Sequence, residues 1–442
     1  MRGGDGMSVV GGGSRSPIVL AVQNASLLSE LYGADVLDVV GAELVDRIRP
    51  LLSSVEGGEV EHLSAGRLAI HGCESDSCGN ANLIERVLLE ACGASVRLGG
   101  RSVVVSIAVL SSAGLSFCSE GVGDLASFGG AIVDFARGER EYLLLDMRRA
   151  VDVYDAILDG GVCSLLQQVS SESGGVDNLF HECHVYVGGL ADVAGLVPLS
   201  EFRHHMRRLG LTRYIDRIVL SEAICRLREN PNLVLVCSIS AASAICDAWW
   251  RSVFDELEAD CSLSERLVVK LNGFADLCEV GPAVSFALYL KMIGCGVAVD
   301  YSGSCQKALA FLVASRSDVV FVDARQLNVN GVGVSDVRLT GQLDVAQTFA
   351  LFGYLVPYLV VSGVDTPGLW ELLCRSGAEW FQGAYIGAPS LAEPSGQTWR
   401  FKGIKKEKEI NLISRKNKIV HARERIMPAA GLSRVSGGAR FW

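Results

Sequence analysis

Four side chains that can bind metal ions stand in a row at His181-Glu182-Cys183-His184. A zinc site needs its ligands at spacings that bring them to one point, as the helical HExxH pattern does. The run here lacks that spacing and borders an apolar segment typical of a β-strand. Successive side chains of a strand point to opposite faces, so Glu182 and His184 would face away from His181 and Cys183. We therefore do not expect zinc at this position.

The cysteines give no stronger metal signal. Cys73 and Cys78 lie in a loop rich in Gly, Ser and Asp, and no second pair follows. A surface turn with free thiols is expected there. Cys237, Cys246 and Cys295 lie inside apolar runs. This placement predicts buried, reduced thiols, which are typical of a reducing cytoplasm.

Composition indicates a folded chain with an uneven charge. The 442 residues are 49% hydrophobic and 20% charged, which suits two or three domains and excludes a mostly disordered chain. Residues 400–442 hold 12 Lys and Arg against 3 Asp and Glu, a net charge of +9. Because the whole chain has a net charge of −10, the remaining residues carry −19. The body should not attract nucleic acid. The basic tail is either a solvated end or an arm that docks on an acidic surface.

No targeting or membrane segment is expected. The first 16 residues are rich in glycine and lack the apolar core of a signal peptide. The longest apolar stretches, 232–244 and 348–361, are shorter than the roughly 18–20 residues that span a bilayer. We expect a cytoplasmic protein.

Strand and helix patterns alternate in the first part of the chain, which predicts one α/β domain. The predicted elements are a strand at Pro17–Val22, a helix at Ala25–Leu52, a strand at Arg67–His71, a helix at Asn82–Cys92 and a strand at Val103–Leu110. A connecting helix is predicted at Asp146–Leu158, ended by Gly160 and Gly161.

Seven further strands recur at intervals suited to βα units: Cys183–Val187, Leu233–Ile239, Leu267–Leu271, Val297–Asp300, Val319–Asp323, Tyr358–Ser362 and Trp380–Tyr385. Near-continuous apolar strands indicate a parallel sheet buried on both faces. The number of units favours a (β/α)8 barrel, with a doubly wound sheet as the alternative. Trp249 and Trp250 are expected to pack among the barrel helices, with exposure of one of them for partner contact as the alternative. The basic stretch from Arg203 to Arg208 is either a solvated face or a patch for an acidic partner.

An ordered series of motifs in the second half resembles the EAL domain, the phosphodiesterase fold that acts on cyclic di-GMP. The likeness covers about 165–390 and implies an EAL-type, TIM-like barrel. The matching segments are Gly195-Leu196-Val197-Pro198 with Glu201-Phe202 ("GLVPPxEF"), Gly296-Val297-Ala298-Val299-Asp300 with Gly303 ("GVxLDDFG"), Asp318 to Asp323 ("DxxKID"), Val360 to Thr366 ("VAEGVET") and Gly377 to Pro389 ("GxDxxQGYxxGxP").

The first part resembles a GGDEF domain, the cyclase that commonly precedes an EAL domain. Leu31-Tyr32-Gly33 with Val40-Gly41 is similar to "tyGHxxGD", and Val105 to Val109 is similar to "vSiGva". Ser64-Ala65-Gly66-Arg67-Leu68 stands where "GGDEF" itself would be. The resemblance places Arg67 at the catalytic glutamate, Ser64-Ala65 at the glycine pair and a metal aspartate near Gln23. We therefore expect no cyclisation of GTP.

For the EAL half, the resemblance implies two Mg²⁺ or Mn²⁺ ions held by carboxylates at strand ends. Glu182, Asp300 and Asp323 stand at three of those positions, as vestigial site residues. Other family positions have changed type: an asparagine is Ser238, a glutamate Lys270, the second aspartate Tyr301, the general-base lysine Phe321, a further glutamate Ser362 and a phosphate-binding arginine Tyr186. Gln167, Gln382 and Gly383 remain as candidate ligand-binding residues.

Lys270 reverses the charge beside the expected cations. It either pairs with Glu182 or Asp300, as a salt bridge where a metal would sit, or extends its ammonium to solvent. Either arrangement disfavours divalent ions by several kcal/mol at an effective dielectric near 20.

We therefore interpret the chain as a catalytically inactive GGDEF–EAL signalling protein that acts through protein contacts, with no working catalytic residue and no cofactor. One alternative is a cyclic di-GMP receptor that does not hydrolyse its ligand. Another is a residual phosphodiesterase that holds Mg²⁺ or Mn²⁺ on Glu182, Asp300 and Asp323. The signalling partner is not identified, and a homodimer is plausible from the resemblance. The expected division is a flexible N-terminus (1–16), a GGDEF-like domain (17–115), a linker with a helix (116–160), an EAL-like barrel (161–392) and a basic tail (393–442).

Overall fold

The computed structural model describes residues 17–72, 78–111, 139–171, 178–188, 195–303, 305–328 and 343–391. The chain divides into two compact units, Met1–Thr398 and Trp399–Trp442. All described residues belong to the first unit. The expected flexible N-terminus, the basic tail and the Cys73–Cys78 loop, apart from Cys78 itself, lie outside the described residues.

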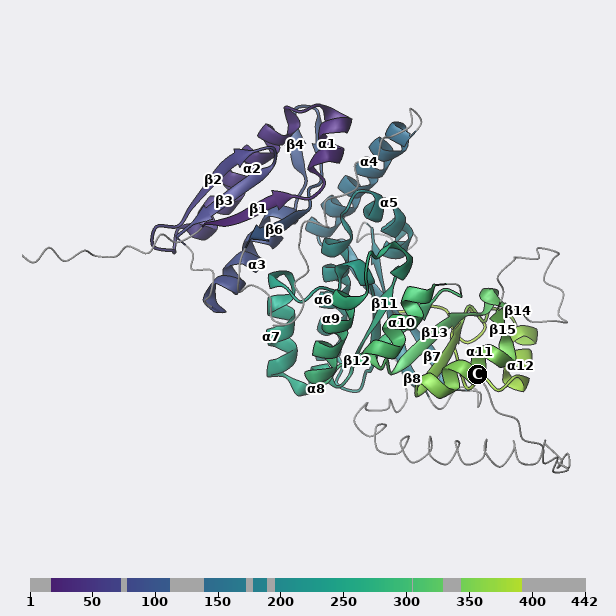
Figure 1. The fold of residues 1–442 in the computed structure, drawn as a ribbon. Coiled ribbons are helices and arrows are strands. Elements are labelled where there is room, and N and C mark those ends of the chain that lie inside the picture. Colours follow the sequence, from purple (N-terminus) through teal and green to yellow (C-terminus); the bar gives the residue numbers. More distant parts are fainter. Residues whose placement is uncertain are drawn as a thin grey trace, which may run out of the picture. The chain divides into compact units, whose positions relative to one another are not determined.

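The N-terminal part is an antiparallel sheet with helices, shown in purple and blue in Figure 1. Its strand order is β2-β3-β1-β6, and a separate hairpin joins β4 to β5. The strands are β1 (Ile18–Val22), β2 (Glu59–Ser64), β3 (Arg67–His71), β4 (Val96–Leu98), β5 (Arg101–Val103) and β6 (Ile107–Ser111). The helices are α1 (Ala25–Tyr32), α2 (Val36–Leu52) and α3 (Cys78–Cys92).

Two sequence predictions in this part need correction. The single helix expected over Ala25–Leu52 is two helices, because Gly33 adopts a φ of 97° that an α-helix cannot contain. The strand expected over Val103–Leu110 is divided between β5 and β6. In α2 the apolar spacing does bury one face, since Val40, Leu44 and Ile48 are fully buried.

Helix α4 (Glu139–Leu158) is the connecting helix, and it begins seven residues before the predicted start. Met147, Ala150 and Tyr154 lie on one side of it and are fully buried. This spacing of three and four residues is that of an amphipathic helix face.

Eight strands close into a barrel, which confirms the predicted barrel and excludes the doubly wound sheet. The closing contact pairs β10 with β8, where Leu235 lies opposite His181 and Val236 opposite Glu182. The strands are β7 (Val162–Ser171), β8 (Asn178–Val187), β10 (Leu235–Ser240), β11 (Leu267–Asn272), β12 (Gly296–Tyr301), β13 (Val319–Asp323), β16 (Tyr358–Ser362) and β17 (Trp380–Phe381).

The barrel departs from the predicted all-parallel sheet at β7, which the sequence analysis did not find. This strand runs antiparallel to both of its neighbours, β8 and β17. Its alternation of buried and half-buried residues is weaker than the continuous apolar runs of the parallel strands. β7 begins at Val162, one residue after the expected boundary at 161.

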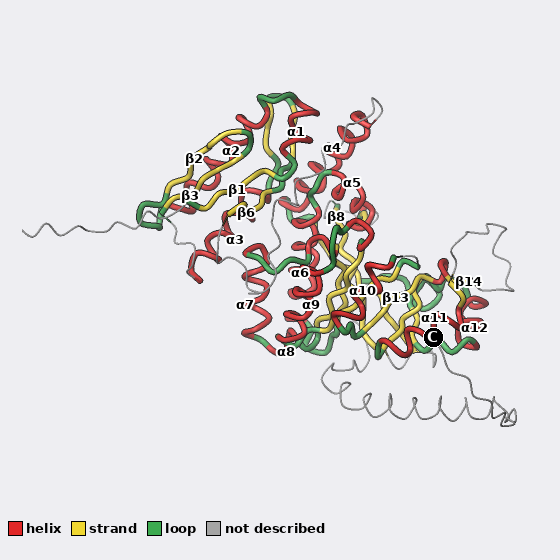
Figure 2. Tube along the Cα trace, viewed as in Figure 1, coloured by secondary structure: helices red, strands yellow, loops and turns green. Residues whose placement is uncertain are grey.

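Helices follow most barrel strands, as Figure 2 shows in red against the yellow strands. They are α5 (Arg203–Arg208), α6 (Thr212–Glu229), α7 (Arg251–Ala259), α8 (Cys261–Ser264), α9 (Gly281–Met292), α10 (Gln306–Ser315), α11 (Val345–Leu355) and α12 (Pro367–Arg375). Short elements are β9 (Val197–Pro198), β14 (Leu327–Asn328), β15 (Leu343–Asp344), η3 (Leu199–Phe202), η4 (Ala241–Ser243), η5 (Ala248–Trp250), η6 (Phe274–Asp276) and η7 (Ala324–Gln326).

Several smaller expectations have an outcome in the barrel. Trp249 and Trp250 are buried, as predicted, and so are the free thiols of Cys237, Cys246 and Cys295. Within the described residues, no helix combines the length and apolar character needed to cross a membrane.

Candidate functional site

Glu182 lies in the middle of β8, and its carboxylate is the centre of a buried polar group. Lys270 Nζ lies 2.6 Å from Oε1. Ser238 Oγ donates to the same oxygen at 2.9 Å, and Gln382 Nε2 donates to Oε2 at 2.8 Å. Burial acts to raise the pKa of Glu182, but the Lys270 ammonium, with His184 and the hydrogen bonds, outweighs burial and lowers the pKa to about 2. The carboxylate is therefore ionised and fully partnered at neutral pH.

Lys270 is held inside the barrel by the register of the strands. It lies opposite Ser238 on β10 and Ala298 on β12, and its side chain is only 8% exposed. Its ammonium also lies over the ring of Phe321, 4.1 Å from the centroid, which is a cation–π contact. Of the two arrangements that the sequence allowed, the structure shows the salt bridge with Glu182 and not the extension to solvent.

Asp300 lies near the end of β12 beside this ion pair. Burial raises the pKa of Asp300, and the nearby Lys270 ammonium only partly opposes that rise. The next residue, Tyr301, is buried and donates its hydroxyl to Gly303 O at 3.0 Å. The second aspartate position of the motif is thus filled by a packed aromatic ring.

Asp323, at the end of β13, has a cation of its own that the sequence analysis did not identify. Its Oδ1 accepts from the backbone N and from Nε of Arg325, at 2.8 and 3.0 Å. Arg325 Nη2 reaches Oδ2 at 2.5 Å, although its side chain is 83% exposed. The sequence signal that could have found this pair is an arginine two residues after an aspartate at a strand end. The turn that follows β13 lets the Arg325 side chain fold back onto Asp323.

The three predicted ligand-binding residues are occupied by contacts within the chain. Gln167, on β7, contacts His184 Nε2 through its oxygen at 3.1 Å and donates Nε2 to Gly387 O at 2.9 Å. Gln382 is used by Glu182, as described above. At Gly383 a Cβ would lie 2.3 Å from backbone atoms of Val364, so close packing of the backbone requires glycine there.

Arg203 supports the mouth of the barrel from outside. Its Nη2 donates to Ser238 O at 2.5 Å, and its Nη1 to Asp216 Oδ1 at 3.1 Å. Asp216 also accepts from Ser240 N at 2.9 Å and from Ser243 Oγ at 2.6 Å. Because Arg203 is engaged in the barrel, it does not belong to the solvated face expected for the basic stretch at 203–208; the alternative of a patch for an acidic partner stays a prediction.

Other residues of that stretch are also engaged. His205 is buried with its Nδ1 2.5 Å from Asp146 Oδ1, and Arg208 reaches Asp146 at 2.7 Å. Arg207 pairs with Asp276 at 2.9 Å. The stretch, which forms α5, therefore contacts α4 and the barrel, while Arg207 and Arg208 stay 58% and 46% exposed.

In the N-terminal part, the Ser64–Leu68 segment is a hairpin turn between β2 and β3. Ala65 and Gly66 have φ values of 47° and 73°, which suits a tight two-residue turn. Arg67, at the start of β3, is exposed. Gln23 accepts from Ser106 Oγ at 2.8 Å.

Comparison with known families agrees with the barrel. The family model of the EAL domain matches residues 182–389, beginning at Glu182. The chain contains an EAL domain. The matched segment begins inside β8, so it does not include β7. The structure shows that β7 nevertheless belongs to the barrel. A search of curated proteins finds no match.

Solved structures with EAL domains resemble the chain at low identity. An EAL domain protein from Listeria monocytogenes is 18% identical with a TM-score of 0.46, and the match covers 59% of this chain and 98% of that one. The S helix–GGDEF–EAL part of Vibrio cholerae LapD, bound to c-di-GMP, is 15% identical with a TM-score of 0.47, covering 85% and 90%. The Bacillus subtilis YkuI protein, in complex with c-di-GMP and calcium, is 16% identical with a TM-score of 0.43, covering 61% and 65%.

The donors at the mouth of this EAL domain do not fit a pair of divalent ions. Such ions need several oxygen ligands that are free to bind them. Here Glu182 already pairs with Lys270, Asp323 already pairs with Arg325, and the ring of Phe321 lies against the ammonium. In the described parts of the chain, no group of three or more His, Cys, Asp or Glu side chains is arranged to hold a metal.

Proposed function

We propose that this chain is a catalytically inactive EAL-domain signalling protein that acts through protein contacts. Its N-terminal part serves as a GGDEF-like domain without cyclase activity, because Arg67 and Ser64-Ala65 replace the acidic and glycine residues of that motif. The EAL domain keeps the barrel and has lost the chemistry at its mouth. Signalling then depends on what surfaces the two parts present to a partner.

The Lys270–Glu182 ion pair is the observation that supports this proposal most strongly. Phosphodiester hydrolysis in this family relies on divalent ions that polarise the phosphate and activate water. A buried ammonium 2.6 Å from Glu182 neutralises that ligand and repels a divalent ion at the same position. Displacing the ammonium would leave Lys270 buried and unpaired, which costs several kcal/mol.

Three further features support the loss of activity. The base position of the motif holds Phe321, the second aspartate position holds Tyr301, and a glutamate position holds Ser362. Phe321 cannot take a proton, and Tyr301 and Ser362 replace carboxylates with neutral hydroxyl groups that bind divalent ions much more weakly. A single substitution at Lys270 would therefore not restore turnover.

A hydrolysis and binding assay with labelled cyclic di-GMP tests the proposal. The full chain is incubated with the nucleotide in Mg²⁺ and in Mn²⁺, and bound nucleotide and linear pGpG are both measured. We expect neither. Linear product in either metal would establish the residual phosphodiesterase built on Glu182, Asp300 and Asp323. Binding without product would establish the receptor alternative.

A pair of charge-reversed variants sharpens the test at the level of the metal. In Lys270→Glu the repelling ammonium is gone and a carboxylate joins Glu182, so calorimetric titration should detect Mn²⁺ binding that is absent from the wild type. Lys291→Glu is the matched control, because Lys291 pairs with Asp318 at 3.0 Å elsewhere in the barrel. Equal Mn²⁺ binding by the wild type and Lys270→Glu would contradict the proposed role of Lys270.

A further inference from the structure

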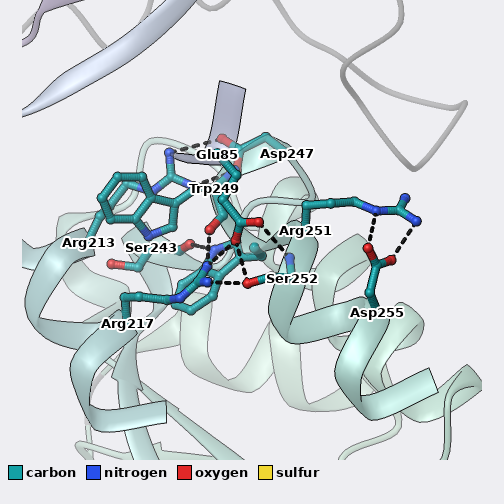
Figure 3. A network of polar contacts seen from close by, with 10 residues as sticks. Glu85, Arg213, Arg217, Ser243, Asp247, Trp249, Arg251, Ser252 and Asp255 are labelled. Carbon is teal, nitrogen blue, oxygen red and sulfur yellow. Dashed lines mark hydrogen bonds and ion pairs between the residues drawn. The ribbon is translucent and has the colours of Figure 1, made fainter. Parts of the chain in front are cut away.

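A small cavity lies where the N-terminal part, helix α4 and the barrel meet. Its volume is about 10 Å³. The N-terminal part contributes Cys92 and Ser106 to its lining, α4 contributes Tyr154, and the barrel contributes Arg213, Tyr214 and Trp249. The polar contacts around Arg213 and Trp249 are drawn in Figure 3.

Three residues of this lining carry a buried polar atom without a partner among the described residues. The atoms are Tyr154 Oη, Arg213 Nε and Trp249 Nε1. Tyr154 is 0% exposed and Trp249 is 2% exposed, so bulk water does not reach them. Buried polar groups in native proteins nearly always have a hydrogen-bond partner, so three such atoms on residues that line one cavity point to a bound group.

The neighbouring contacts explain why these particular atoms remain. Arg213 uses Nη1 and Nη2 on the two oxygens of Asp247, at 2.9 and 2.7 Å, which leaves Nε (Figure 3). Tyr214 stacks on Tyr154 with ring centroids 4.6 Å apart and donates its own hydroxyl to Gly93 O. The unpartnered atoms of Tyr154, Arg213 and Trp249 therefore remain in the same arrangement that makes these neighbouring contacts.

Size and charge both select the occupant. A cavity of about 10 Å³ holds about one water molecule. The positive charge of Arg213 is already balanced by Asp247, so the cavity does not call for an anion. A neutral acceptor of two hydrogen bonds, which can also donate, fits the three atoms.

We propose that this cavity binds one buried water molecule. The water accepts from Trp249 Nε1–H and Arg213 Nε–H and donates to Tyr154 Oη, which makes the three hydrogen bonds typical of a buried water. It thereby joins the connecting helix to two elements of the barrel, α6 and η5. This water is independent of the proposed function, because it does not involve the mouth of the barrel.

Cross-relaxation between water and tryptophan indole protons tests the site in the full, ¹⁵N-labelled and deuterated chain. The Trp249 indole N–H should show a cross-peak to a long-lived water. Trp250 is an internal comparison, because its indole N–H donates to Ser243 O at 2.9 Å and should show none. The variants Trp249→Phe and Trp250→Phe assign the two indole resonances.

Two results in the wild type would overturn the proposal. One is the absence of a water cross-peak at Trp249, which means a dry cavity. The other is a saturable shift of the Trp249 indole resonance with chloride but not with acetate, which means a halide site. The hydroxyl proton of Tyr154, which exchanges with water, could also give a cross-peak to the Trp249 indole proton. The variant Tyr154→Phe removes this hydroxyl, and the cross-peak should persist in it. Loss of the cross-peak in this variant would also overturn the proposal.

Discussion

Two buried ion pairs of similar geometry serve different purposes in this chain. At the mouth of the barrel, Lys270 lies 2.6 Å from Glu182, with side chains 8% and 6% exposed. Where α3 meets α6, Arg217 lies 2.7 Å from Glu85, with side chains 8% and 3% exposed (Figure 3). Distance and burial do not distinguish these two ion pairs. The difference between them lies in the other contacts that their side chains make.

The arginine pair is fully integrated into its surroundings. Arg217 also donates to Trp249 O and, at 2.6 Å, to Ser252 Oγ, and it lies 5.9 Å from the ring centroid of Trp250. Glu85 accepts from Ser252 N at 2.8 Å and from Ser252 Oγ at 3.0 Å. A planar guanidinium satisfies several acceptors at fixed angles, which suits a clamp between two segments of chain.

The lysine pair has fewer fixed partners. The ammonium of Lys270 contacts Glu182 and the face of Phe321, and an ammonium is a compact point charge without a fixed fork of donors. This is the kind of group that can stand where a metal ion stands in an active relative. The comparison indicates that Arg217 holds parts of the chain together, whereas Lys270 neutralises Glu182, the carboxylate that we propose as a vestigial metal ligand.

Removing the clamp should have the largest effect on stability. In Arg217→Met, Glu85 stays buried without its counter-ion, and we expect the free energy of unfolding to fall by about 4 kcal/mol. Urea denaturation followed by circular dichroism measures the change. The double variant Glu85→Gln with Arg217→Met should recover part of the loss, because no buried charge is left unpaired. A double variant less stable than Arg217→Met would contradict the clamp.

Removing the ammonium at the mouth should have a smaller effect, of about 3 kcal/mol in Lys270→Met. Ser238 and Gln382 still donate to Glu182, which limits the loss. Lys291→Met is the matched control, because its partner Asp318 is more exposed than Glu182. An equal loss in both variants would mean that Lys270 has no special role.

The same variant has a predicted acid dependence. The folded pKa of Glu182 is about 2 against an ordinary value of 4.5, so its contribution is complete above pH 4.5 and is lost as the pH falls towards 2. Without the ammonium the folded pKa rises, so Lys270→Met should lose less stability than the wild type over that range. Parallel curves for the two proteins would contradict this.

The sequence predicted the barrel, but it left two arrangements open for Lys270: pairing with Glu182 or Asp300, or extension to solvent. Continuous apolar runs are strong signals for parallel strands buried on both faces, so seven strands were found. β7 was missed because an antiparallel strand with half-buried positions has a weaker pattern. Motif order placed Lys270 at the same end of the barrel as Glu182 and Asp300, but it could not decide between an ion pair and extension to solvent.

The contacts between distant segments could not be predicted. Nothing in the sequence around Glu85 indicates a partner at Arg217, 132 residues later, because helix packing decides which exposed-looking positions become buried. Arg325 was missed for a local reason, since its contact with Asp323 depends on the turn after β13. Charge and spacing identify candidates, and packing decides which of them meet.

Another test concerns His181, the neighbour of Glu182 on the opposite face of β8. Burial lowers the pKa of His181 to about 4, from an ordinary value of 6.5. The unfolded chain therefore binds more protons than the folded chain between pH 6.5 and pH 4, and stability falls as the pH falls through this range. We expect His181→Phe to remove about 2 kcal/mol of that loss.

Unfolding midpoints at pH 7 and pH 4.5 measure this effect for the wild type and His181→Phe. His71→Phe is the control, because His71 lies in the N-terminal part with a side chain that is 40% exposed. If the wild type and His181→Phe lose the same stability on acidification, His181 is not the group responsible. The acid sensitivity of β8 would then come from Glu182 alone, at lower pH.

The smallest effect should come from the second cation at the mouth. Arg325 is 83% exposed, and solvent and salt screen its attraction to Asp323. Arg325→Ala should therefore lower the free energy of unfolding by less than about 1 kcal/mol, and the difference should shrink further in high salt. Arg375→Ala is the matched control, since Arg375 pairs with Glu371 at 3.4 Å and is 78% exposed. A loss of stability as large as that in Lys270→Met, and unchanged by salt, would contradict this prediction. It would mean that Asp323, and not Glu182, is the carboxylate at the mouth that most needs a counter-ion.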